Sequence, residues 1–188
     1  MAKENEKRPY VCLAEFAGSL DNSLRRLVHK PRRILETHVG KGMSVLDLGC
    51  GPGYFTIELA KLVGEEGRVI AADLQQGMLD KVAGKIRGTD LEQRVEIHKC
   101  QDDLIGISQK VDFVLAFWMV HEVADQDKLF RELKSVLKPD GKIYITEPKL
   151  HVSLKSFGTM INRIENLGFE ISEGPKVVFS RTVLLKIR

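Results

Sequence analysis

From position 44 onward, two patterns of apolar residues alternate along the chain: short continuous runs and sets with helical spacing. The continuous runs are rich in Val, Ile and Phe, which is typical of strands that are covered on both faces. The other sets place apolar residues three or four positions apart, which predicts helices with one buried face. The predicted strands are 44–48, 68–73, 94–98, 111–117, 142–147, 169–172 and 177–186. The predicted helices lie at 55–63, 78–86, 129–137 and 154–167.

This alternation of strands and helices predicts an α/β fold with a doubly wound, Rossmann-like sheet in a three-layer α/β/α sandwich. Turn residues separate several of the elements. Gly64–Gly67 and Pro139-Asp140-Gly141 are predicted turns, Gly168 is predicted to end the last helix, and Gly174-Pro175 joins the last two strands. With 188 residues and no internal repeat, the chain is expected to form one compact domain overall.

The first 40 residues have a different pattern. Residues 1–18 are predicted to be a loosely docked arm, and Leu20, Leu24, Leu27 and Val28 have the spacing of a helix. Pro31 can begin a second short helix that contains Ile34, Leu35 and His38. We therefore expect residues 1–40 to be a helical arm that caps the substrate, and residues 41–188 to hold the ligand-binding domain.

Composition and charge exclude several classes of protein. The chain is 43% hydrophobic and 29% charged with a net charge of +3, too small to indicate a nucleic-acid partner. Residues 1–44 hold nine of the basic residues against five acidic ones. This excess could favour an anionic substrate or surface, but a solvated helix face is the preferred explanation. Three cysteines without metal-like spacing predict neither a disulfide framework nor a metal site.

The sequence contains no apolar run long enough to span a membrane. Its first nine residues are charged and lack the apolar core of a signal peptide. The expected location is therefore the cytoplasm.

The strongest functional signal is the run from Val45 to Phe55, which predicts a buried strand, a glycine turn and the start of a helix. Glycines at alternate positions let the backbone approach a ligand closely. Asp47 would repel a pyrophosphate and attract a cationic amino group. The dinucleotide fingerprint also fails here, because its third glycine would fall on Tyr54. A nucleoside cofactor with an ammonium group, S-adenosylmethionine, therefore fits this turn better than NAD.

The segment from Asp47 to Gly53 resembles the first motif of class I S-adenosylmethionine-dependent methyltransferases. The resemblance continues through Asp73, the strand around Phe113 and residues 137–141, and it covers residues 44–188. It is nearest to the small-molecule, methyltransferase type 11-like group. It implies a mostly parallel sheet of order 3-2-1-4-5-7-6 with the last strand antiparallel. It also implies an enzyme that releases S-adenosylhomocysteine.

In such a sheet the ligand lies beyond the carboxyl ends of the strands, at the switch point between strands one and four. The resemblance implies that Asp47 acts on the methionine amino group, directly or through water, and that Gly49 and Gly51 pass close to the ligand. Asp73 would accept hydrogen bonds from the ribose hydroxyls, or alternatively cap the helix that follows it. The other expected cofactor-binding residues are Cys50, Gly53, Leu74, Met78, Gln101, Asp102, Ala116 and Phe117.

The loop that contains Gln101 and Asp102 has two interpretations. Gln101 stands where members of the family often have an acid for the adenine amino group, and its carbonyl could accept in the same way. A solvated loop around Gln101 and Asp102 is the other interpretation. Trp118, after the fourth strand, is expected to pack rather than to stack on the ligand.

Methyl transfer needs alignment and exclusion of water, and it needs a general base only when the acceptor must lose a proton. His121, followed by Glu122, comes just after the fourth strand and is the candidate catalytic residue. Its alternative is a local capping or packing role. Further candidates in the N-terminal segment are Tyr10, His29 and His38.

The expected partner is a small or flat methyl acceptor. No Asn/Asp-Pro-Pro-aromatic stretch follows the fourth strand, and no large lid is inserted after the fifth. One alternative is methylation of RNA or protein, through the basic residues Arg25, Arg26, Lys30, Arg32 and Arg33. Others are a non-catalytic cofactor-binding partner subunit and a nicotinamide oxidoreductase. No feature of the sequence predicts the oligomeric state.

Overall fold

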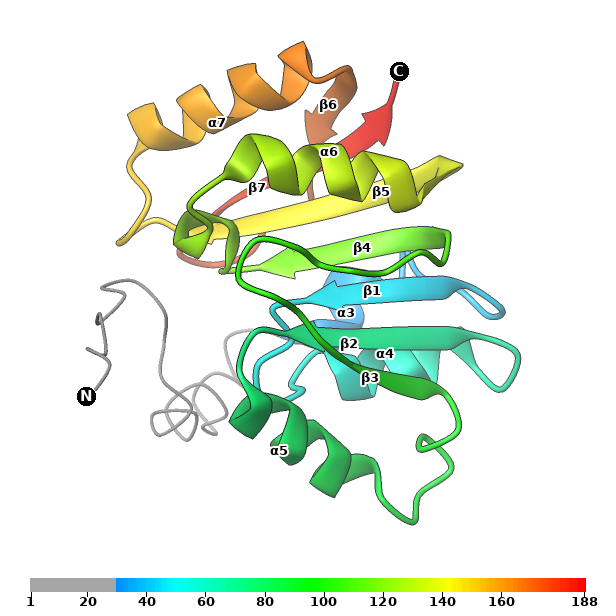
Figure 1. Cartoon of the computed structure of the whole chain (residues 1–188). Helices are drawn as coiled ribbons and strands as arrows, with labels where there is room; N and C mark the ends of the chain where they lie inside the picture. Colours follow the sequence, from blue (N-terminus) through cyan, green and yellow to red (C-terminus); the bar gives the residue numbers. More distant parts are fainter. Residues whose placement is uncertain (1–29) are drawn as a thin grey trace, which may run out of the picture.

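The computed structural model describes residues 30–188, in which seven strands form one sheet of order β3-β2-β1-β4-β5-β7-β6 (Figure 1). The strands are β1 (Ser44–Leu48), β2 (Arg68–Asp73), β3 (Val95–Lys99), β4 (Val111–Phe117), β5 (Leu137–Pro148), β6 (Phe169–Glu173) and β7 (Ser180–Ile187). The helices are α3 (Pro31–Leu35), α4 (Thr56–Val63), α5 (Gln76–Ile86), η2 (Val120–Glu122), α6 (Gln126–Val136) and α7 (Leu154–Asn166).

The predicted strand order and direction are confirmed. Strands β1 to β5 pair in parallel, whereas β7 runs antiparallel to both of its neighbours, β5 and β6. The helix after β1 covers one face of the sheet and the helix after β4 covers the other. The switch point therefore lies between β1 and β4, as the sequence predicts.

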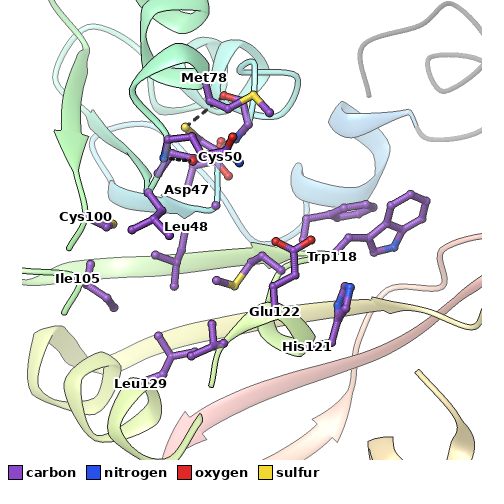
Figure 2. Close-up of a pocket in the computed structure, with 18 of the residues that line it drawn as sticks. Asp47, Leu48, Cys50, Met78, Cys100, Ile105, Trp118, His121, Glu122 and Leu129 are labelled. Atoms are coloured by element: carbon purple, nitrogen blue, oxygen red, sulfur yellow. Dashed lines mark hydrogen bonds between the residues drawn. The ribbon is translucent and has the colours of Figure 1, made fainter. Parts of the chain in front are cut away.

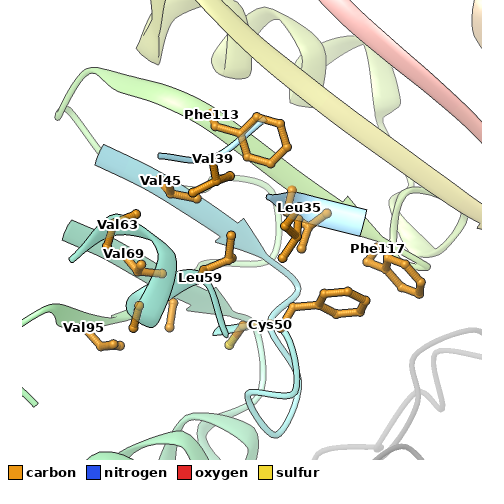
Figure 3. Packing of buried hydrophobic residues seen from close by; sticks show 14 of the residues in the cluster. Leu35, Val39, Val45, Cys50, Leu59, Val63, Val69, Val95, Phe113 and Phe117 are labelled. Atoms are coloured by element: carbon orange, nitrogen blue, oxygen red, sulfur yellow. The ribbon is translucent and has the colours of Figure 1, made fainter. Parts of the chain in front are cut away.

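Alternating side chains of the strands divide the core into two layers. Val45 and Phe113 point to the face covered by α3, α4 and α5, whereas Leu46 and Val114 point to the face covered by α6 and α7. Figure 3 shows the first layer, where Leu35 of α3 and Leu59 of α4 lie against the strands. Both faces of the central strands are thus buried, which explains their continuous apolar runs.

The Pro139-Asp140-Gly141 turn is not a break between elements, because β5 already begins at Leu137. Val111 of β4 pairs with Leu137, and the next matched pair is Phe113 with Lys142, so five steps along β5 oppose two along β4. The residues of the predicted turn lie within this irregular part of β5. The Lys138 ammonium group donates to both carboxylate oxygens of Asp112 (2.9 and 2.8 Å), which holds the irregular segment against β4.

Near the N-terminal boundary, α3 is shorter than predicted, because it ends at Leu35 and leaves His38 in the turn that follows. The predicted helix at residues 20–28 lies outside the described residues, and the cap formed by residues 1–40 stays a prediction. Among the described helices, none has the length and apolar composition that crossing a bilayer requires.

Candidate active site

A cavity of about 950 Å³ opens beyond the carboxyl ends of the parallel strands β1 to β5. Figure 2 shows Cys50, Met78 and Cys100 on one side of it and Trp118, His121 and Glu122 on the other. The predicted residues that line the cavity are Asp47, Gly49, Cys50, Gly51, Asp73, Leu74, Met78, Gln101, Asp102, Phe117 and His121. The fold therefore brings together residues that are more than 70 positions apart in the chain.

Two predicted residues, Gly53 and Ala116, do not line this cavity. Gly53 has a positive φ of 86°, and a Cβ atom there would lie 3.0 Å from Cγ2 of Val82. It therefore lets the glycine turn pack against α5. Ala116 is fully buried on the α6 and α7 face of the sheet, beside Leu48 in the neighbouring strand.

The glycine turn presents backbone to the cavity. Gly51 has a φ of 53°, and a Cβ atom there would meet open space, so its backbone is accessible to a ligand. At Gly49 a Cβ atom would lie 2.8 Å from Cβ of Met119, another residue of the cavity wall. The Lys85 ammonium group donates to the carbonyl of Pro52 at 2.7 Å and ties the turn to α5.

Asp73, at the end of β2, holds this turn in place through hydrogen bonds. One carboxylate oxygen accepts from the amide of Gly51 (2.9 Å) and the other from the amide of Gln75 (2.8 Å), which precedes α5. Burial raises the pKa of Asp73, although these amides oppose the shift. A carboxylate has about four acceptor positions, so the two amides do not exclude hydroxyl donors from a ligand. The contact with the Gln75 amide before α5 is therefore compatible with ligand binding by Asp73.

Asp47, at the end of β1, is only 2% exposed, and one of its oxygens accepts from the hydroxyl of Thr56 at 2.6 Å. Thr56 is the first residue of α4 and has no exposed surface. The helix that begins after the glycine turn therefore supplies a donor to the acid that precedes the turn. This contact sets the orientation of the carboxylate at the cavity wall.

The loop after β3 closes one end of the cavity. The backbone amides of Ile105 and Gly106 donate to the two carboxylate oxygens of Glu132 on α6, at 3.0 and 2.8 Å. Lys128, also on α6, lies 2.7 Å from the exposed carboxylate of Asp103. The loop that carries Gln101 and Asp102 is thus fastened to α6.

Two thiols line the same region. Burial raises the pKa of Cys100 to about 12 and moves the pKa of Cys50 in the same direction. Both side chains are therefore protonated at neutral pH. This agrees with a packing role rather than a reactive one.

Trp118 forms the wall at the end of β4 and has a positive φ of 61°, which is uncommon outside glycine. Its amide donates to the carbonyl of Thr146 at 2.7 Å, and its indole N–H donates to the hydroxyl of Ser180 at 3.0 Å. The ring contacts Phe117 at a centroid distance of 5.3 Å. These contacts fix the chain direction just before His121.

His121 lies in η2, and its Nδ1 atom is 2.5 Å from a carboxylate oxygen of Glu147. Glu147 is only 1% exposed, and its second carboxylate oxygen accepts from the amide of Val120 at 3.0 Å. Burial disfavours the charged imidazole, but the hydrogen bond and charge of Glu147, with the charge of Glu122, outweigh it. The pKa of His121 is therefore raised above its usual value.

Three residues at or beside the site were not predicted from the sequence: Glu147, Thr56 and Met119. Glu147 could have been predicted, because it is an acidic residue at the end of an apolar strand, like Asp47 and Asp73. The predicted site drew on the carboxyl ends of the first four strands and not on that of the fifth. Thr56 and Met119 have no comparable signal, because only the folded chain places them beside the turn.

Of the further candidates, His38 stacks on Phe113 with a centroid distance of 6.2 Å, and it does not line the cavity. Burial lowers its pKa. Tyr10 and His29 lie outside the described residues.

The doubly wound sheet and the acid-flanked glycine turn at its switch point define a class I S-adenosylmethionine-dependent methyltransferase. The chain matches the family described as "Methyltransferase domain" over residues 40–176, and it belongs to that family. It is therefore an enzyme whose cofactor is S-adenosylmethionine.

Two curated relatives carry more specific names. The chain is 41% identical over 112 residues to demethylmenaquinone methyltransferase of Lactobacillus johnsonii, a match that covers 58% of this chain and 45% of that protein. It is 32% identical over 110 residues to the ubiquinone/menaquinone biosynthesis C-methyltransferase UbiE of Escherichia coli, with coverage of 58% and 44%. The match thus spans less than half the length of these relatives.

Solved structures agree along nearly the whole chain. A SAM-dependent methyltransferase from Aquifex aeolicus superposes with a TM-score of 0.82 and 26% identity, covering 93% of this chain and 98% of its own. A putative S-adenosyl-L-methionine-dependent methyltransferase from Methanococcus maripaludis has a TM-score of 0.76 at 19% identity, with coverage of 100% and 97%. The second likeness concerns the fold alone.

Proposed function

We propose that this enzyme transfers a methyl group to a small, flat acceptor that must lose a proton, and that His121 takes this proton. The supporting observation is that one cavity is lined both by the glycine turn and by a histidine whose Nδ1 is bonded to a buried carboxylate. The same cavity is also lined by large apolar side chains. They are Trp118, Met119, Leu129, Leu150 and Phe179.

The cavity residues suit the cofactor. S-adenosylmethionine supplies a methyl group on a positively charged sulfur atom, which makes the group ready for in-line displacement. We assign the ribose hydroxyls to Asp73 and the methionine amino group to Asp47, because these carboxylates line the cavity on either side of the turn. Gly51, where a Cβ atom would project into open space, would let the backbone approach the cofactor closely.

The remaining cavity would hold the acceptor and exclude water from it. A neutral imidazole on its wall can accept a proton from a hydroxyl group or an acidic carbon. One relative is named a demethylmenaquinone methyltransferase, and another is named a C-methyltransferase of ubiquinone and menaquinone biosynthesis. We therefore propose a hydroxylated aromatic ring of the quinol type as the acceptor class.

The test is incubation of the full chain with S-adenosylmethionine labelled in its methyl group and a panel of acceptors. The panel contains a 1,4-naphthoquinol, a catechol, a simple thiol, total RNA and a protein mixture. We expect label in the quinol product and S-adenosylhomocysteine in equal amount. Label only in RNA or protein would overturn the proposal.

Calorimetric titration with S-adenosylmethionine, S-adenosylhomocysteine and NADH separates a defect in cofactor binding from a wrong acceptor. If the first two ligands bind but no member of the panel is methylated, the proposed acceptor class is wrong. Binding of NADH alone would indicate the oxidoreductase.

One basic residue of the RNA or protein alternative has acidic neighbours. Arg32 lies 3.4 Å from a carboxylate oxygen of Glu36 and 3.6 Å from one of Glu58, so acidic partners offset its charge. Arg25 and Arg26 lie outside the described residues.

A further inference from the structure

We propose that Glu147 is the positioning residue of this site, which holds His121 in the one tautomer that leaves Nε2 free to accept the acceptor's proton. The use of this tautomer in catalysis rests on the proposed function, but the tautomer itself does not. Glu147 is the penultimate residue of β5, the strand that pairs with β4, and its carboxylate accepts from two donors at the start of η2. Both contacts come from a side chain that is 1% exposed.

The two donors that Glu147 binds differ in kind. The amide of Val120, a residue with no exposed surface, always carries its hydrogen and therefore always needs an acceptor. The Nδ1 atom of His121 is a donor in one neutral tautomer and an acceptor in the other. Because an ionised carboxylate is only an acceptor, it requires the hydrogen on Nδ1. The lone pair of the neutral imidazole is then on Nε2.

Other polar and titratable groups lie on the elements next to His121 and Glu147. Glu122 adds negative charge from η2, and His151, in the loop after β5, has its ring centroid 5.7 Å away. On β7, Arg181 lies opposite Glu147 in register. A side cavity of about 240 Å³ adjoins this cluster, and α6 and α7 contribute the uncharged residues Gln126, Ser156 and Met160 to its wall.

During transfer, the acceptor's proton would move to Nε2 and the electron pair of the broken bond would stay on the acceptor. The imidazolium that forms keeps its Nδ1–H on Glu147, whose negative charge stabilises it. The Nε2 proton then passes to water when the product leaves, and the neutral tautomer returns. No oxidant or reductant enters this cycle.

A change from Glu147 to Gln separates positioning from packing, because Gln has almost the same shape. Its single amide oxygen must serve the fixed donor Val120, so its NH₂ group faces Nδ1 of His121. An NH₂ group there requires Nδ1 to be the acceptor and moves the hydrogen to Nε2. The same logic underlies the loss of about 10⁴-fold in kcat when the triad aspartate of a serine protease is changed to Asn.

The experiment is NMR of the full chain with ¹⁵N-labelled histidine, recorded over a pH series. The His121 signals are assigned from their absence in His121→Asn. For the unmodified chain we expect a neutral imidazole with hydrogen on Nδ1, and for Glu147→Gln we expect hydrogen on Nε2 and a lower pKa. Hydrogen on Nε2 in the unmodified chain would overturn the proposal, and this measurement decides even if the variant fails to fold.

Glu122→Gln is the matched control, because it removes a negative charge near His121 without removing the carboxylate that bonds Nδ1. It should lower the pKa of His121 but leave the hydrogen on Nδ1. If Glu122→Gln and Glu147→Gln gave the same tautomer, Glu147 would act through charge alone and the proposal would fail.

Turnover gives the second readout. Glu147→Gln should lower kcat by about 10²- to 10⁴-fold and leave calorimetric binding of S-adenosylmethionine unchanged. The expected tautomers without methylation of any acceptor would reject the proposed function and retain the positioning role. Quinol methylation with the opposite tautomer would do the reverse.

Discussion

The carboxylate of Asp73 accepts a hydrogen bond from the amide of Gly51 at 2.9 Å, across 22 positions of sequence. This contact joins the end of β2 to the glycine turn after β1. The residue assigned to the ribose therefore also holds the turn that would face the rest of the cofactor. Changes at Asp73 should alter both features together.

Replacement of Asp73 by Ala should weaken binding of S-adenosylmethionine by about 1–3 kcal/mol, because donors on the ligand and on the turn lose their acceptor. Calorimetric titration measures this loss. Asp80→Ala, on the exposed side of α5, is the control and should leave the affinity unchanged. Equal affinity in Asp73→Ala and the unmodified chain would reject the ribose assignment.

The affinity for S-adenosylmethionine should also fall in acid. Burial raises the pKa of Asp73 above the usual value of 3.8, so the carboxylate loses its charge at a higher pH than an exposed aspartate does. A protonated carboxyl accepts fewer hydrogen bonds. Titrations at decreasing pH should show this loss in the unmodified chain, and the pH dependence should be weaker in Asp73→Ala.

Thr56→Val should lower the free energy of unfolding by about 1–3 kcal/mol, since it leaves the buried carboxylate of Asp47 without the hydroxyl donor 2.6 Å away. Denaturant unfolding gives the value. Thr56→Ser keeps the hydroxyl and should retain most of the stability. A loss as large in Thr56→Ser would mean that the methyl group, and not the hydrogen bond, matters at this position.

Gly53→Ala should destabilise the fold by about 1–2 kcal/mol, because the backbone has a positive φ of 86° and the new Cβ would press on Val82. Gly84→Ala is the matched control on α5, where a Cβ atom meets open space. It should stabilise the fold by about 0.5–1 kcal/mol, as expected for Gly in a helix interior. Thermal unfolding of the two variants should therefore shift in opposite directions.

His121→Asn should lower methyl transfer by about 10²- to 10⁴-fold and leave binding of S-adenosylmethionine intact. In the unmodified chain, activity should rise with pH as His121 deprotonates, with a midpoint above the ordinary value of 6.5 because its pKa is raised. Rates measured over a pH series test this. The same rates in His121→Asn and the unmodified chain would make the residue structural.

The contribution of His121 to stability should fall as pH rises, whereas its contribution to activity should rise. Its folded-state pKa is raised, so its contribution to stability is fully present below the unfolded pKa and is lost as pH rises through the folded pKa. The unmodified chain should therefore lose stability relative to His121→Asn over that interval. Denaturant midpoints of both proteins at several pH values measure the difference.

Much of the fold could be predicted because its signals are local. Continuous apolar runs and helical spacing reflect burial of each element, and they located the strands to within a few residues, apart from the early start of β5. Pro139-Asp140-Gly141 has the composition of a turn, yet β5 runs through it, because pairing with β4 and the contact between Lys138 and Asp112 outweigh local preference.

The candidate site divides in the same way. Asp47 and Asp73 could be predicted because strand ends in a parallel sheet meet at one edge, and both line the cavity. Gly53 looks the same as Gly51 in sequence, but it faces Val82 of α5 and not the cavity. Which way a glycine faces depends on the helix packed beside it, and this is a property of the tertiary structure.

By itself, the sequence determined the alternation of elements, the acid-flanked glycine turn and the acid after β2, because each depends on residues that are close in the chain. Only the tertiary structure decided that Glu147 meets His121, 26 positions away. That contact requires β5 to pair with β4 in a particular register, since a shift of one residue would turn the carboxylate to the other face of the sheet.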